Sequence, residues 1–176
     1  MSNSVFRSRR IFALACSLAV MEAFIGSSAL AQGPKLQEQI VGTWSIVAVI
    51  IDQGGAPHDV FGPNPKGVAT FGSDGRYSLT LLRADLPKIA SNKREAGTPE
   101  ENKAITGGTL AHFGRYSVSE SDRTINFEVE ASSFPNWNGA KQIRLVTRCD
   151  GDVLKWTNPA SSQGTGSSNL TWSRAK

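Results

Sequence analysis

The chain has 176 residues, 39% of them hydrophobic, and a formal net charge of +4, a size that suits one domain with its own hydrophobic core. The basic residues between positions 83 and 103 are interleaved with acidic ones, and we find no continuous basic stripe. This mixture is typical of a solvated surface, so nucleic acid is not expected as a partner.

The N-terminal segment has the pattern of a secretory signal peptide. Three arginines in positions 7–10 precede an apolar run at 11–26, and Ala29 and Ala31 occupy the −3 and −1 positions of a small-residue cleavage site. The apolar run is shorter than the roughly 20 residues of a membrane span, which favours cleavage over an uncleaved anchor. We therefore expect residues 1–31 to be removed, a mature domain at 32–176, a periplasmic or secreted location, and no stable membrane span after cleavage.

Cleavage changes the charge and the cysteine content. The first 31 residues hold three basic residues and one acidic residue, so the mature net charge is +2. They also hold Cys16, which leaves Cys149 as the one mature cysteine and excludes an intramolecular disulfide. A buried, apolar thiol at a strand end is the favoured interpretation of Cys149, with a nucleophile or an intermolecular bridge as alternatives.

Strand patterns dominate the mature chain. Tyr77, Leu79 and Leu81 alternate with polar residues, as in a half-buried strand, and Asp74-Gly75 just before them predicts a tight turn. The segment 56–65 holds three prolines, which exclude a regular helix or a central strand, so we expect a loop there. The predicted strands are 41–51, 66–71, 76–83, 109–119, 124–131, 140–149, 153–157 and 169–174.

One short helix is predicted after the third strand. Thr98 suits the N-cap, Pro99 the first turn with the two acids that follow it, and Gly107-Gly108 the C-terminal end. Eight consecutive antiparallel strands can close into a barrel that has no free edges and holds one small ligand. We therefore predict an all-β fold, an eight-stranded antiparallel barrel with one short helix, preceded by a signal peptide.

Several short motifs give the chain a resemblance to a known family. Gly42-Thr43-Trp44 opens the first strand as the G-x-W signature does in lipocalins and other calycins, and the pairing of F-G-P-x-P-x-G with F-P-N-W-x-G is more specific. Taken together, the chain resembles the lipocalin-like domain family of bacteria and fungi. The matching stretches are 42–44, 61–67, 74–78, 113–118, 134–139, 142–144 and 170–174.

This resemblance implies a small β-barrel with one closed end. In calycins the tryptophan of G-x-W closes the barrel beneath a basic residue from a late strand, which here is Arg174 over Trp44. Such a cation–π contact is worth on the order of 1 kcal/mol. The mouth is then expected at the opposite end of the barrel.

Polar and amphipathic groups on or beside the predicted strands are the candidate ligand-binding residues. A binding barrel needs an apolar wall with a few convergent polar groups, while strand alternation turns about half of all side chains outward. Trp137 has the alternative role of a plug at one barrel end. The candidates are Arg76, His112, Tyr116, Glu128, Trp137 and Arg144.

Patterns for catalytic or metal chemistry are weak. His58 and His112 are the two histidines, far apart in sequence, whereas a catalytic zinc site usually takes three protein ligands. We find no G-x-S-x-G motif and no P-loop. We therefore expect no metal and no cofactor, and the sequence assigns no catalytic residue.

Three functions follow from these observations. The leading hypothesis is an exported barrel that binds a small hydrophobic or amphipathic molecule. The alternatives are a barrel enzyme of the isomerase or cyclase type, which would use His112, Tyr116 and Glu128, and a structural envelope protein with a filled barrel. The interior of the barrel discriminates between these functions. An open apolar cavity favours binding, and an open cavity with two titratable groups within hydrogen-bond reach favours an enzyme. A filled core favours the structural envelope protein. The sequence makes no prediction of oligomeric state.

Overall fold

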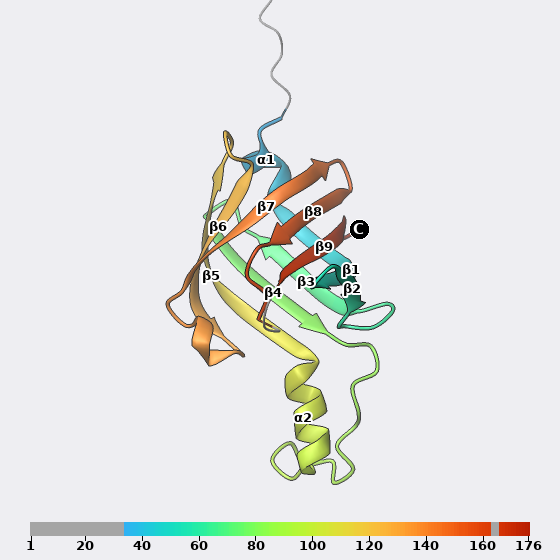
Figure 1. Cartoon of the computed structure of the whole chain (residues 1–176). Coiled ribbons are helices and arrows are strands. Elements are labelled where there is room, and N and C mark those ends of the chain that lie inside the picture. Colours follow the sequence, from blue (N-terminus) through green and yellow to red (C-terminus); the bar gives the residue numbers. More distant parts are fainter. Residues whose placement is uncertain (1–33, 163–165) are drawn as a thin grey trace, which may run out of the picture. The chain divides into compact units, whose positions relative to one another are not determined.

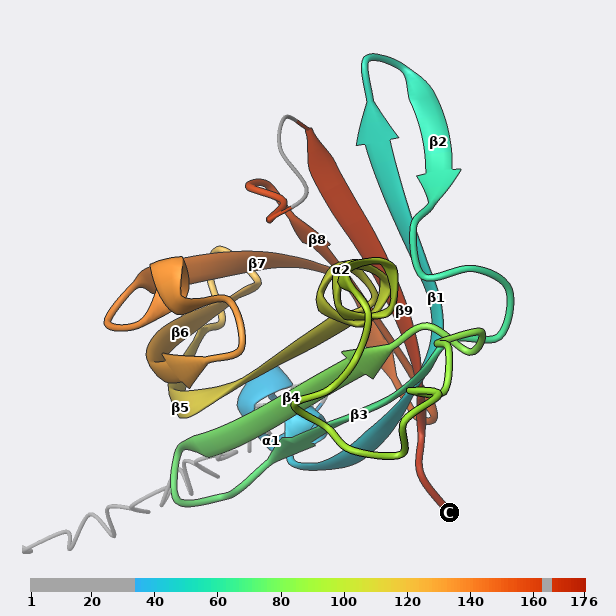
Figure 2. The same cartoon turned by 90° about the horizontal axis from the view of Figure 1, so that it is seen from below.

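The eight predicted strands are all present and close into one barrel. The computed structural model describes residues 34–162 and 166–176, so the predictions for residues 1–31, including cleavage after Ala31, lie outside the described residues. Each barrel strand pairs antiparallel with the next, and the first pairs with the last (Figures 1 and 2). The strands are β1 (Gly42–Gln53), β3 (Lys66–Phe71), β4 (Arg76–Leu82), β5 (Thr109–Ser119), β6 (Thr124–Ser132), β7 (Lys141–Asp150), β8 (Val153–Asn158) and β9 (Ser167–Arg174).

The segment at 56–65 differs in part from the predicted loop. Its first residues form a short strand, β2 (Ala56–Asp59), which pairs with the end of β1 from Gln53↔Ala56 to Ile50↔Asp59. β2 is an edge strand, where Pro57 is tolerated because one side of the strand needs no ladder hydrogen bonds. Figure 2 shows this hairpin extending away from the ring of strands.

The core consists of the inward-facing residues of the barrel strands, as alternation requires. The largest buried side chains are aromatic and pack against one another: the Trp156 ring is tilted against Trp172 at 5.1 Å and lies edge-to-face with Phe71 at 6.2 Å, between ring centroids. Cys149 is also buried and has a free thiol, which confirms its interpretation as a small core residue. The thiol pKa is raised by burial.

One end of the barrel is closed by helix α1 (Leu36–Ile40), which is seen at the top of Figure 1. The Glu120 carboxylate accepts hydrogen bonds of 2.9 Å from the backbone N–H groups of Leu36 and Gln37, which satisfies the N-terminal end of the helix. At the other end of α1, the Trp44 indole N–H donates to the Ile40 carbonyl at 2.8 Å. The short helix is therefore held at both ends by barrel side chains.

Arg174 completes this closure as the resemblance implied. Its guanidinium carbon lies 4.2 Å from the centroid of the fully buried Trp44 ring. The same guanidinium donates to the carbonyls of Gln39, Val41 and Gly151 at 2.7, 3.1 and 3.2 Å. The expected cation–π contact is confirmed, and the three carbonyl bonds add to it a role in anchoring the segment before β1 and the turn between β7 and β8.

The second helix, α2 (Pro99–Gly107), projects from the opposite end of the barrel (Figure 1). Its start has the predicted chemistry: the Thr98 hydroxyl accepts from the Glu101 N–H, and the Glu101 carboxylate accepts from the Thr98 N–H. No helix among the described residues is long and apolar enough to cross a membrane.

Candidate functional site

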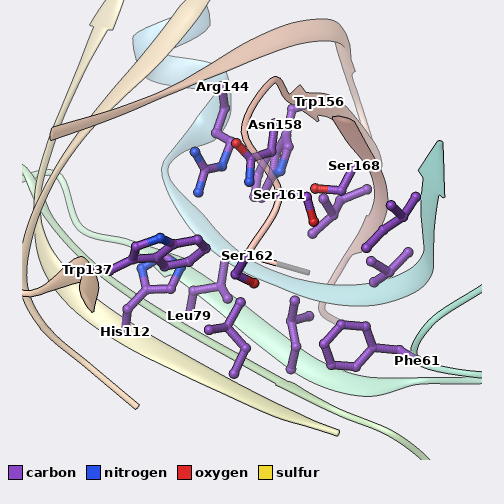
Figure 3. Close-up of a pocket in the computed structure, with 15 residues that line it drawn as sticks. Phe61, Leu79, His112, Trp137, Arg144, Trp156, Asn158, Ser161, Ser162 and Ser168 are labelled. Atoms are coloured by element: carbon purple, nitrogen blue, oxygen red, sulfur yellow. The ribbon is translucent and has the colours of Figure 1, made fainter. Parts of the chain in front are cut away.

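A cavity lies inside the barrel at the end opposite α1. The space between its lining atoms is about 430 Å³ with the mouth included, but the centre of a water molecule reaches only about 30 Å³ of it. The cavity is therefore narrow, and a ligand larger than a few atoms must displace lining side chains. The lining residues are Val49, Ile51, Phe61, Leu79, Leu81, Leu110, His112, Trp137, Arg144, Trp156, Asn158, Ser161, Ser162, Ser168 and Leu170 (Figure 3).

The wall of this cavity is mostly apolar, and its polar groups come from a few strands. Leu79 and Leu81 line it because alternation on β4 turns them inward. Phe61, from the F-G-P-x-P-x-G motif, is buried against them. An apolar wall with a small number of convergent polar groups is the general composition of small-molecule sites.

Trp137 is held over the cavity by the turn of the F-P-N-W-x-G motif. The residues Pro135–Trp137 form one turn of 3-10 helix, η1, and the Phe134 ring lies edge-on to the Trp137 ring at 5.7 Å between centroids. The Asn138 side chain accepts from the Ser132 N–H at 2.8 Å, which ties the turn back to β6. Trp137 is half-buried and lines the cavity at its rim.

His112 faces the cavity from β5 and is nearly fully buried. Its Nδ1 lies 2.9 Å from the Tyr77 hydroxyl, and its ring stands at 82° to the Trp137 ring with 5.6 Å between centroids. Burial, with a further contribution from the charge of Arg144, lowers the His112 pKa to about 3. The imidazole is therefore neutral at pH 7. Burial raises the pKa of Tyr77, which is neutral as well.

Arg144 is the buried cation of this cavity. It lies on β7 between the exposed Ile143 and Leu145, and its own exposed fraction is 4%. Its guanidinium donates to the Gln142 Oε1 at 2.5 Å and to the Ile143 carbonyl at 3.0 Å, and lies 5.3 Å from the centroid of the Phe127 ring. Burial lowers the Arg144 pKa to about 10, so it remains charged at neutral pH.

The structure brings together three of the six predicted ligand residues. His112, Trp137 and Arg144 all line the cavity, and Figure 3 shows the guanidinium of Arg144 facing the rings of Trp137 and His112 across it. These three come from β5, η1 and β7, which are neighbours in the sheet because β6 pairs with both β5 and β7 and η1 connects β6 to β7.

The other three predicted residues do not line this cavity. Tyr116 is buried, but it lies toward the closed end, where its hydroxyl donates to the Gly72 carbonyl at 2.8 Å and lies 3.5 Å from the Gln37 amide nitrogen. Arg76 and Glu128 are exposed because strand alternation places them outward: Arg76 pairs with Glu130 at 3.3 Å, and Glu128 with Lys141 at 3.5 Å.

Tyr116 and Glu128 line a second hollow, formed by β5, β6 and β7, whose space is about 930 Å³ with its open side included and of which the centre of a water molecule reaches about 520 Å³. Most of its lining side chains are exposed, among them Arg115, Lys141 and Ile143. It holds no buried charge like that of Arg144, so the cavity at the mouth is the stronger candidate site.

Sequence reasoning missed several residues of the cavity. Asn158 and Ser168, near the end of β8 and the start of β9, are buried polar residues of its lining. Trp156 also lines it, and its indole N–H has no hydrogen-bond partner among the described residues. Phe61 was within reach of sequence reasoning, because it opens a recognised motif.

Within residues 34–162 and 166–176, no group of three or more His, Cys, Asp or Glu side chains is arranged to hold a metal ion. The two histidines are also separated from each other: His58 lies in the exposed edge strand β2, and His112 lies inside the barrel.

Comparisons with known proteins agree with the barrel. A family model described as a lipocalin-like domain matches residues 41–175. A 4'-hydroxy-3'-methoxypropiophenone carrier protein of Aspergillus oryzae is 34% identical over 84 residues, which cover 44% of this chain and 75% of that protein.

Proposed function

The chain belongs to the lipocalin-like domain family, and we propose that it binds a small, partly apolar molecule in the cavity at the barrel mouth. The observation that carries the proposal is the composition of that cavity, in which leucine and aromatic side chains surround the buried Arg144 and His112. A barrel kept for structure alone gains nothing from a buried charge at its mouth, because burying a cation is costly. The similarity to a carrier protein of a small aromatic ketone supports the same function.

Binding is better supported than catalysis. Tyr77 and His112 are within hydrogen-bond reach of each other, at 2.9 Å, which is one feature of an acid–base pair. Their pKa values are nevertheless displaced in opposite directions away from neutrality, since that of His112 falls to about 3 and that of Tyr77 rises. General acid–base catalysis works best with a pKa near the operating pH. In addition, Tyr77 is absent from the residues that line the cavity.

Native mass spectrometry of protein purified from its own host tests the proposal. We expect a retained small molecule that is released on unfolding. The matched variants are Leu110→Trp, which places a large ring in the cavity, and Val68→Trp, which places the same ring at a position that is 45% exposed on the outside of β3. Leu110→Trp should abolish retention and Val68→Trp should preserve it. Equal retention in the two variants would contradict binding at the mouth.

We further propose that the protein is exported and that it acts in the periplasm or outside the cell. The supporting observation is the signal-peptide pattern of residues 1–31, with alanines at positions 29 and 31. N-terminal sequencing of the protein from the periplasmic or culture fraction should begin at Gln32 or its cyclised form. Recovery of an intact Met1 from the membrane fraction would contradict export with cleavage.

A further inference from the structure

Arg144 and Arg174 are both inward-facing arginines, but their surroundings differ. Arg174 donates from Nε and from both terminal nitrogens to three backbone carbonyls, so its side chain is used in closing the barrel. Arg144 donates to one carbonyl and one amide oxygen, both on residues adjacent or nearly adjacent to it in β7. An arginine has five N–H donors, and the remaining three of Arg144 have no acceptor among the described residues.

Among the described residues, Arg144 also has no counter-charge. The ion pairs among the described residues join Arg76 to Glu130, Arg83 to Asp85, Lys141 to Glu128, and Arg148 to Asp150, and all eight side chains are at least 42% exposed. A buried charge is normally paired, since the low dielectric of the interior penalises an isolated ion. In the described part of the chain, no carboxylate pairs with Arg144, although its guanidinium faces a cavity.

The neutrality of His112 makes Arg144 the source of positive charge at this site. The pKa of His112 is lowered mainly by burial and further by Arg144, so the imidazole contributes ring surface without charge at pH 7. The lining residues also include no Asp, Glu or Lys. A ligand with an acidic oxygen would therefore meet one cation and no competing anion.

The shape and the ring surfaces of the cavity indicate the rest of the ligand. Trp137 and His112 stand at 82° to each other and form a corner opposite Arg144 (Figure 3). A flat ring can lie against the face of one and the edge of the other, an arrangement that aromatic groups favour. Because the centre of a water molecule reaches only about 30 Å³ of the cavity, such a ring enters only when lining side chains move aside.

We infer that the cavity takes a small, flat, aromatic molecule that carries an acidic oxygen, a carboxylate or an ionised phenol, and that this oxygen pairs with the guanidinium of Arg144. This inference rests on the proposed binding function and adds the charge of the ligand and the residue that recognises it. The planar, forked guanidinium suits a carboxylate especially well, because two N–H donors can reach its two oxygens.

Calorimetric titration with cinnamate and cinnamamide tests the inference, since these probes have almost the same shape and differ in charge. The wild-type protein should bind cinnamate at least tenfold more tightly than cinnamamide. Arg144→Met should weaken cinnamate binding tenfold or more and change cinnamamide binding less than threefold. Arg144→Lys, which retains the charge without the fork, should retain part of the preference.

Arg76→Met is the matched control, because it removes one positive charge from an exposed position outside the barrel. It should leave both affinities unchanged. Equal binding of the two probes by the wild type, or a cinnamate preference that survives in Arg144→Met, would overturn the inference.

The two proposals fail in different ways. If neither probe binds but the protein from its host retains a neutral molecule, the charge assignment is wrong and the binding function stands. If neither probe binds and no molecule is retained, both proposals are wrong. Retention of an organic acid in the wild type and its loss in Arg144→Met would support both.

Discussion

Replacing Arg144 with methionine should stabilise the protein, which is the opposite of the usual effect of a core substitution. Burial lowers the Arg144 pKa to about 10, and at 1.36 kcal/mol per pKa unit this displacement costs the charged form about 3 kcal/mol. Methionine retains an unbranched apolar stem and removes the charge. The variant loses hydrogen bonds to Gln142 and Ile143, each worth about 1 kcal/mol. The free energy of unfolding should therefore rise by about 1 kcal/mol.

Urea denaturation at pH 7, followed by tryptophan fluorescence, measures this change. The comparison variant is Arg174→Met, which removes hydrogen bonds to three carbonyls together with the contact to the Trp44 ring. Its free energy of unfolding should fall by about 4 kcal/mol, at about 1 kcal/mol for each of the three hydrogen bonds and for the cation–π contact. The free energy of unfolding of Arg144→Met could instead fall by more than about 1 kcal/mol at an unchanged m value. That result would show that the Arg144 guanidinium stabilises the fold as that of Arg174 does. The argument that it serves a ligand would then be refuted.

Three further predictions concern the core. Trp44→Ala should cost about 3–5 kcal/mol in urea denaturation, because a fully buried ring and its bond to the Ile40 carbonyl are lost; wild-type stability would contradict its closing role. The pKa of His112 is lowered to about 3 in the folded state, so the unfolded chain takes up the proton first and stability should fall as the pH drops from about 6.5 toward 3. His112→Asn should flatten that fall, and parallel stability curves would show that another group causes it. Since Cys149 is a buried free thiol, reductant should leave the melting temperature unchanged; a drop of several degrees would reveal a stabilising intermolecular bridge.

The barrel could be predicted from the sequence because its signals are local. Alternation on β4, the Asp74-Gly75 turn and the Thr98 cap each need only a few neighbouring residues, and all appear in the structure. The strand β2 was missed because three prolines suggested a loop. β2 can pair with the end of β1 because it lies at the edge of the sheet, and the local sequence does not reveal that position.

The cavity was harder to predict because its residues depend on which way each strand faces. On β1, Trp44 and Ile46 are buried, and after an irregularity between Ile46 and Ala48 the buried residues are Val49 and Ile51. Such a bulge reverses the alternation without a clear mark in the sequence. The inward orientation of Arg144 is equally hidden, because a charged residue in an alternating strand usually faces water.

The proposed binding site is tested most directly by nuclear magnetic resonance of the tryptophan indole N–H groups during a titration with cinnamate. Trp137 and Trp156 line the cavity, and Trp44 lies at the closed end beneath Arg174. Binding at the mouth predicts that the indole resonances of Trp137 and Trp156 shift together and saturate, while that of Trp44 stays in place. A saturable shift at Trp44 with none at Trp137 and Trp156 would contradict binding at the mouth, and the absence of any shift at these three tryptophans would contradict the assignment of an acidic aromatic ligand.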